Sequence, residues 1–197
     1  MKKGSLKGRL SAVLLLSLVS LPAALSPACS DAESEAKVDA LELEEVVAYF
    51  AVRGAVRGKD GEQYNYIHPV VRFRIKNAGM EEAGYIQAMA VFKRESFPDE
   101  PWGNDFLYSI SETPLAPGAE SDLITMRADT NFVSKDAPER MFQNEKWEKI
   151  SVSVFLRVGP SSWKPVLSLD VPRQIGAPGL EKFLEPGTDT PSAPQPR

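Results

Sequence analysis

The sequence predicts an all-β protein, built as a single antiparallel β-sandwich of about seven strands. Residues 71–76 alternate strictly between apolar and basic side chains, and residues 152–158 place Val or Leu at every second position. An alternation of period two is typical of a strand with one face in a core and the other in water. Turn-forming residues separate the predicted strands, and no segment has the apolar spacing of a long helix.

The first part of the folded region predicts three strands. Residues 41–56 begin with alternating Leu and Glu, continue as an apolar, β-branched run, and end at the turn-forming cluster 58–61. Residues 71–76 form the next strand, which ends at the turn residues 77–79. Residues 85–93 are apolar on both faces, which indicates a central strand covered on both sides.

The middle of the chain predicts a loop followed by two short strands. Residues 96–105 are rich in Pro and acids and are expected to form the loop. A short strand over 106–111 follows. Pro117 and Gly118 fit the centre of a type II turn, which leads into a strand over 121–126.

The last part predicts an irregular stretch and a closing hairpin. Residues 129–149 lack alternation, and a short helix is expected near 137–143 because Pro138 suits the first turn of a helix. The strands over 152–158 and 163–171 are joined by turn-forming residues and form the hairpin.

The N-terminus has the pattern of a secretory signal peptide. Residues 1–9 carry four Lys and Arg residues and no acid. The apolar run that follows, 10–25, is too short to span ~30 Å of hydrocarbon comfortably. Small residues come next, so residues 1–28 are predicted to be removed on export.

Cys29, the single cysteine of the chain, stands where the mature protein would begin. This arrangement resembles a bacterial lipoprotein signal peptide, although Ser26 and Pro27 depart from that pattern while Ala28 fits it. The resemblance implies that the Cys29 thiol is acylated and inserted into a membrane, and Ser30 then favours the outer membrane over the inner one. Ordinary cleavage after Ala28 is the alternative, and it would leave a soluble periplasmic or secreted protein.

The mature chain is expected to have three parts: an acidic tether (29–40), the sandwich (41–175) and a Pro-rich disordered tail (176–197). Removing the four signal cations takes the net charge from −4 to about −8. This acidic balance argues against a nucleic-acid partner, because such binding rests on clustered Lys and Arg. The expected partners are the membrane, through acylated Cys29, and another protein of the cell envelope.

Residues for catalysis or for a cofactor are not grouped in any recognisable motif. His68 is the single histidine and precedes a proline at the start of a strand, where a surface or strand-edge position is expected. Acids near residues 99–105 and 129–136 supply oxygen atoms suited to calcium, but their spacing matches no defined loop. The sequence therefore predicts a protein that is not an enzyme and that has no metal or cofactor.

Three aromatic residues are the candidate partner contact: Trp102, Phe106 and Tyr108. Trp102 is flanked by Pro101 and Gly103 in the predicted loop, where a partly exposed ring would suit a protein or carbohydrate ligand. The alternative is that Trp102 folds back over the open end of the core.

The order of strands and turns between Val71 and Gly118 resembles a bacterial immunoglobulin-like module of the FxLYD-like group. The matching elements are the strand and turn over 71–79, the aromatic-bearing strand over 89–93, and Leu-Ala-Pro-Gly at 115–118. The resemblance implies an extracytoplasmic immunoglobulin-like sandwich and carries no catalytic residue.

The expected function is a non-enzymatic envelope lipoprotein whose immunoglobulin-like module binds or scaffolds another envelope protein. The second hypothesis is a lipoprotein that binds a small ligand or carbohydrate with the loops at one end of the sandwich. A glycosidase using two carboxylates is the third, and it would need a cleft between them.

We expect the mature protein from its native host to begin at Cys29 and to carry acyl chains on that residue. Intact-mass measurement of the detergent-extracted protein checks this, and a Cys29→Ser variant is the matched control without acylation. An unmodified thiol on Cys29 would contradict the anchor.

Overall fold

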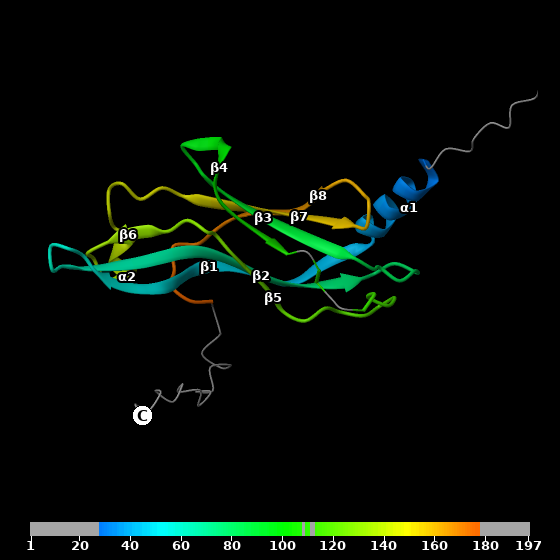
Figure 1. The fold of residues 1–197 in the computed structure, drawn as a ribbon, viewed down its shortest axis with the longest axis horizontal. Helices are drawn as coiled ribbons and strands as arrows, with labels where there is room; N and C mark the ends of the chain where they lie inside the picture. Colours follow the sequence, from blue (N-terminus) through cyan, green and yellow to red (C-terminus); the bar gives the residue numbers. More distant parts are fainter. Residues whose placement is uncertain (1–27, 108, 111–112, 178–197) are drawn as a thin grey trace, which may run out of the picture.

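A computed structural model describes residues 28–107, 109–110 and 113–177 (Figure 1). The elements in these residues are two helices and eight strands, in the order α1 (Ala28–Asp39), β1 (Leu41–Arg57), β2 (Gln63–Asn77), β3 (Ile86–Arg94), β4 (Phe97–Leu107), β5 (Ile124–Arg127), β6 (Phe132–Ser134), α2 (Pro138–Met141), β7 (Ile150–Val158) and β8 (Lys164–Asp170).

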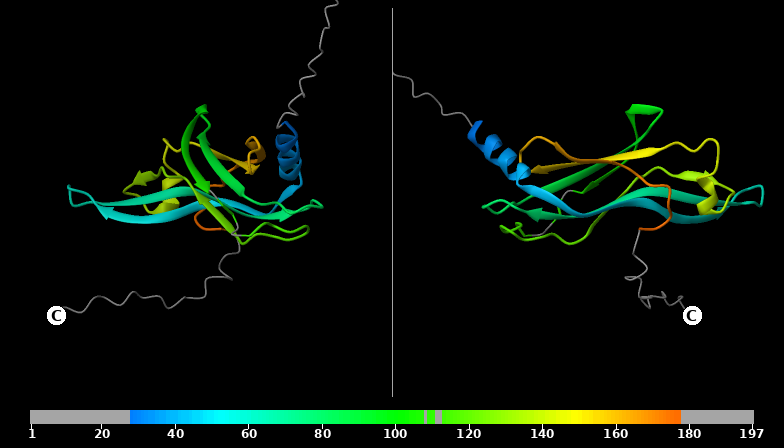
Figure 2. Two further views of the ribbon diagram at one scale, coloured as in Figure 1. Left: turned by 45° about the vertical axis from the view of Figure 1, so that its right-hand side comes forward. Right: turned by 180° about the vertical axis from the view of Figure 1, so that it is seen from behind.

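The strands form two four-stranded antiparallel sheets. The first has the order β1-β2-β5, with β6 also paired to β2, and the second has the order β4-β3-β7-β8. The chain passes between the sheets after β2, after β4 and after β6, as in the Greek-key connections of immunoglobulin-like sandwiches. The view turned by 45° and the view from behind show one sheet lying over the other (Figure 2). The predicted all-β sandwich is therefore confirmed, with eight strands in the described residues.

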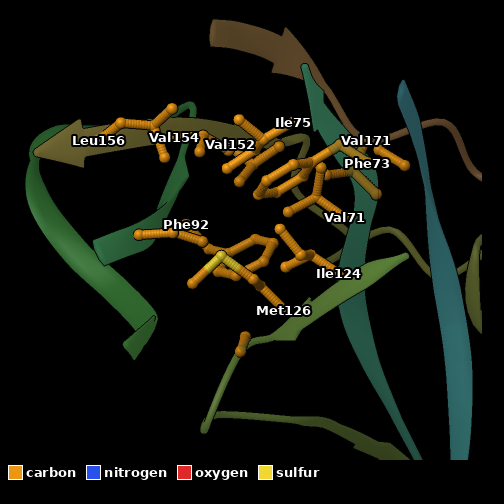
Figure 3. Packing of buried hydrophobic residues seen from close by; sticks show 14 of the residues in the cluster. Val71, Phe73, Ile75, Phe92, Ile124, Met126, Val152, Val154, Leu156 and Val171 are labelled. Carbon is orange, nitrogen blue, oxygen red and sulfur yellow. The ribbon is translucent and has the colours of Figure 1, made fainter. Parts of the chain in front are cut away.

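The core lies between the sheets and is filled by every second residue of their strands. Val71, Phe73 and Ile75 of β2 point from one sheet toward Phe92 of β3 and Leu156 of β7 in the other (Figure 3). All five of these side chains are fully buried. The basic residues that alternate with the β2 members are only half-buried on the outer face, as the period-two pattern predicts.

The loop predicted over residues 96–105 is wrong, because this segment belongs to strand β4. Phe106 pairs with Met89 of β3, and Gly103 pairs with Phe92. Prolines are tolerated here because β4 is the edge strand of its sheet, where one side of the backbone needs no partner. The register is also irregular next to Pro101, so the alternation that marks other strands is lost in the sequence.

Two smaller elements lie in the stretch predicted as irregular. Helix α2, Pro138–Met141, confirms the short helix expected near 137–143, and Pro138 stands in its first turn. Strand β6 has only three residues and was not predicted. It pairs with β2 between Asn65 and Ile67, upstream of the predicted start of that strand at Val71.

The predicted tether contains helix α1, which no sequence pattern anticipates. Lys37 forms an i,i+4 ion pair with Glu33 at 2.9 Å, a pair that favours helix. Val38 in the last turn is 1% exposed and joins the core. The Lys164 ammonium contacts the Asp39 carboxylate at 2.8 Å, so the helix end is fixed beside the start of β8. No helix among the described residues is long and apolar enough to cross a membrane.

Asn77 connects two loops at the end of β2 and is 1% exposed. Its Nδ2 donates to the carbonyl oxygens of Glu81 and Leu115, both at 2.8 Å. Its Oδ1 accepts the N–H of Gly79 at 3.0 Å. The Asn77 backbone carbonyl also accepts the N–H of Gly118, whose φ of +76° in the predicted type II turn suits glycine.

We expect Asn77→Ala to lower the free energy of unfolding by about 3 kcal/mol, because buried carbonyls of two loops lose their donor. Urea unfolding at neutral pH checks this. Asn144→Ala is the control, because exposed Asn144 accepts only one backbone N–H, at 2.9 Å, and its loss should cost about 0.5 kcal/mol or less. Equal destabilisation by the two changes would contradict the role given to Asn77.

Candidate functional site

Trp102, one of the three predicted contact residues, packs at the end of the core. Its half-buried ring lies 4.6 Å from the ring of Phe132. Phe132 in turn stacks on Trp147 at 4.2 Å and meets Phe50 edge-on at 6.1 Å. Trp102 is therefore in contact with an aromatic cluster that includes a fully buried phenylalanine.

Phe106, the second predicted contact residue, has a different aromatic partner. Its half-buried ring meets Trp163 edge-on at 5.5 Å, and the Arg157 guanidinium lies 4.7 Å from the Trp163 ring. Phe106 pairs with Met89, which alternates with the core residues of β3 and so faces outward. Tyr108, the third, lies outside the described residues.

The first sheet is exposed at the end of β1 and β2 that is far from α1, where residues 52–57 of β1 are all exposed. The β1–β2 turn and α1 lie at opposite ends of the long axis (Figure 1). We define the distal face as the outward side chains near this turn. Its members are Arg53, Val56, Tyr64, Tyr66, Asn131 and Val133.

A bulge in β1 sets the direction of the Arg53 side chain. The register shifts between Val52 and Gly54, which leaves Arg53 without a cross-strand partner. Gly54 has a φ of +143°, a conformation that L side chains rarely adopt. The Arg53 Nη1 atom donates to Asn131 Oδ1 at 3.3 Å. β1 and Asn131 lie on opposite sides of β2, so the guanidinium crosses the outer face of that strand.

This crossing leaves a shallow cleft of about 370 Å³ on the distal face. The wall consists of apolar and backbone atoms of the bulged strand, the ring of Tyr66, and the polar ends of Arg53 and Asn131. A volume of this size is within the range of ligand-binding pockets. The cleft therefore combines an apolar surface with one cation.

His68 lies next to this cleft on the outer face of β2 and is 8% exposed. It falls in the gap between β5 and β6, because Val70 pairs with Arg127 of β5 and Ile67 pairs with Phe132 of β6. Neither imidazole nitrogen has a hydrogen-bond partner among the described residues. The expectation that His68 is a surface or strand-edge residue is therefore wrong.

The surroundings of His68 disfavour its charged form. Burial lowers the pKa of the imidazole, and the positive charges of Arg127 and Arg53 lower this pKa further. The nearby Asn131 side chain raises this pKa as a hydrogen-bonding neighbour, although it does not reach hydrogen-bond geometry with either ring nitrogen. Protonation of His68 would thus place a third positive charge beside two arginines.

A further cation on the same outer face also lacks a partner. Arg72 follows His68 by four residues on β2, so the two side chains share a face. The Arg72 Nε atom is buried without a hydrogen-bond partner. Among the ion pairs of the described residues, none includes Arg53, Arg72 or Arg127.

Asp105 and Asp129, two acids near Arg127, accept backbone N–H groups. An Asp129 carboxylate oxygen accepts the N–H of Asn104 on β4 at 3.1 Å. Asp105 accepts the N–H of Arg127 at 2.9 Å and its own neighbour's N–H at 2.8 Å. Among the described residues, no three His, Cys, Asp or Glu side chains are close enough to hold a metal ion.

Comparisons with known proteins add little to this description. No protein-family model matches the chain, and curated protein sequences give no significant match. Among solved structures, the ligand-binding region of serine-glutamate repeat protein A (SgrA) of Enterococcus faecium aligns with 66% of this chain and 98% of its own. The sequence identity is 13% and the TM-score is 0.26, so no functional argument is taken from it.

We expect the chain to lose stability as the pH falls from 7.5 to 5.5, in part through His68. The unfolded imidazole has the ordinary pKa of about 6.5, and the folded one has a lower pKa. The unfolded state therefore binds more protons between these two values, and the free energy of unfolding falls as the pH drops through them.

Urea unfolding at several pH values measures this slope in the original chain and in a His68→Gln variant. The variant should show a shallower decline, because carboxylates then supply the only remaining pH dependence in this range. Identical slopes for the two proteins would contradict a lowered pKa at His68.

Proposed function

We propose that this chain is an exported lipoprotein, acylated at Cys29, whose immunoglobulin-like sandwich binds another protein of the cell envelope without catalysing a reaction. Export is supported by the basic and apolar segments of residues 1–28, and acylation by the position of the one cysteine. The outer membrane is the proposed location because Ser30 follows the cysteine. A soluble periplasmic or secreted form is the alternative.

The single observation that carries this proposal is the placement of the anchor relative to the distal face. Helix α1 begins at Ala28, next to Cys29, and lies at one end of the sandwich. The distal face lies at the other end, beside the β1–β2 turn (Figure 1). A molecule held at Cys29 would therefore present the distal face away from the membrane.

The side chains of the distal face suit a protein partner. Val56 is 57% exposed and Val133 is 51% exposed. Tyr64 and Tyr66 are half-buried beside them, and Arg53 is exposed. Tyrosine and arginine are the residue types enriched among those that dominate binding energy, because each combines a large apolar area with a polar group.

The second hypothesis, a carbohydrate or small ligand bound at the end loops, has weaker geometric support. The cleft beside Phe132 and Trp147 has a volume of about 150 Å³, which is below the usual size of a ligand pocket. Trp102 is half-buried against Phe132 and so presents only part of its ring. Trp102 and Phe106 are kept as a second proposed contact for a protein partner.

We expect a photo-crosslinking amino acid at Tyr66 to capture a specific envelope protein in intact cells. The same substitution at Met80 is the matched control, because Met80 is 97% exposed but lies beyond β2 at the end near α1. Affinity purification and mass spectrometry identify the adducts. Equal capture from both positions would contradict a distal binding face, and capture from Phe106 alone would move the contact to the second sheet.

A further inference from the structure

The outer face of β2 carries three arginine side chains that form no ion pair with an acid among the described residues. Arg53 reaches it from β1, Arg127 from β5, and Arg72 from β2 itself. Each lacks an ion pair among the described residues, although the chain as a whole has a net charge of −4. A local excess of positive charge attracts anions to this face.

Buried donors next to these cations also lack acceptors. His68 is 8% exposed, and both of its ring nitrogens are without a partner. A buried imidazole normally has a hydrogen-bond partner for at least one nitrogen, because an unpartnered buried polar group is destabilising. Its neighbours on the adjacent strands are Arg53, Arg127, Tyr49 and Asn131, none of which is a carboxylate.

A cleft beside Arg53 opens on the same outer face of β2 as His68. It is open to solvent, has a volume of about 370 Å³, and is bordered by Arg53, Asn131 and Tyr66. The Arg53 guanidinium makes one hydrogen bond with Asn131, at 3.3 Å, so most of its five N–H donors are free for a ligand.

From these observations we infer that the cleft and His68 form a binding site for a carboxylate group. Arg53 would donate hydrogen bonds to the carboxylate oxygens, Arg127 would balance the charge, and an imidazole N–H would donate a further hydrogen bond to the bound anion. This inference rests on the proposed function, because it identifies the carboxylate as an acidic side chain or C-terminus of the protein partner. The guanidinium fork matches the two oxygens of a carboxylate.

Acidic residues of the chain itself are a second source of the carboxylate, besides a protein partner, and the experiment distinguishes the two. Gly176 donates its N–H to Phe50 on β1, and Ala51, the next residue along, is opposite His68. The sequence beyond the described residues contains Glu181 and Glu185. A variant that ends at Ala177 therefore distinguishes the chain's own acids from those of a partner.

NMR of His68 tests the site directly, because it is the only histidine and its imidazole signals need no assignment. The mature full chain with Cys29→Ser, prepared without a histidine tag, is titrated with acetate and, at equal ionic strength, with chloride. We expect acetate to shift the carbon-bound imidazole protons in a saturable way and to raise the pKa of His68. Chloride should do neither.

Two variants locate the binding. Arg53→Gln and Arg127→Gln should each weaken acetate binding by about tenfold, which corresponds to roughly 1.4 kcal/mol. Arg57→Gln, a change of an exposed arginine at the end of the same β1 strand, is the matched control and should leave binding unchanged. Thermal unfolding of each variant verifies that it is folded, and Arg53→Lys keeps the charge if Arg53→Gln is unstable.

Each possible result of these experiments either supports or overturns the carboxylate site. No saturable shift, an equal shift with chloride, or binding of inorganic phosphate without acetate would overturn it. Binding of acetate only by the variant ending at Ala177 would support the site and assign its carboxylate to residues 178–197. Crosslinking through Tyr66 without acetate binding would remove the carboxylate site and leave the proposed function intact.

Discussion

The structure depends on the burial of β2 on both of its faces. Its inward residues, including Val71 and Phe73, form the centre of the core, while outward Val70 and His68 are also almost fully buried. β2 pairs with β1 on one side and with both β5 and β6 on the other. Backbone hydrogen bonds alone would allow this strand to slip, but a shift of one residue would exchange its two faces and place basic side chains in the core.

The burial of β2 also explains why a polar site with unpaired positive charges lies on an otherwise regular sheet. Because the inward positions of β2 must be apolar, its polar side chains Tyr66, His68 and Arg72 lie on the outward face. The bulge at Gly54 then directs Arg53 across this face, and the gap between β5 and β6 leaves His68 paired with β1 on one side only. The apolar inward face of β2 and the bulge at Gly54 together produce the cationic cleft.

Much of the sandwich is readable from the sequence because its strands alternate, as in residues 71–76 and 152–158. β4 was missed because Pro98 and Pro101 are allowed on an edge strand, and α1 because its docking rests on one apolar residue, Val38. The cleft could not be predicted, since Arg53, His68, Arg127 and Asn131 come from separate strands and meet only through sheet pairing. Gly54, within an apolar strand, was the one local signal that a bulge was present.

The pKa of His68 in the ligand-free full chain is the most direct test of this account. The carbon-bound imidazole protons report it in an NMR titration at low salt, with no other histidine to interfere. A pKa below the ordinary value of about 6.5 is expected, and it should rise when Arg53 and Arg127 are both changed to Gln. An ordinary or raised pKa that does not respond to these two substitutions would contradict a buried, cation-flanked histidine beside the distal face.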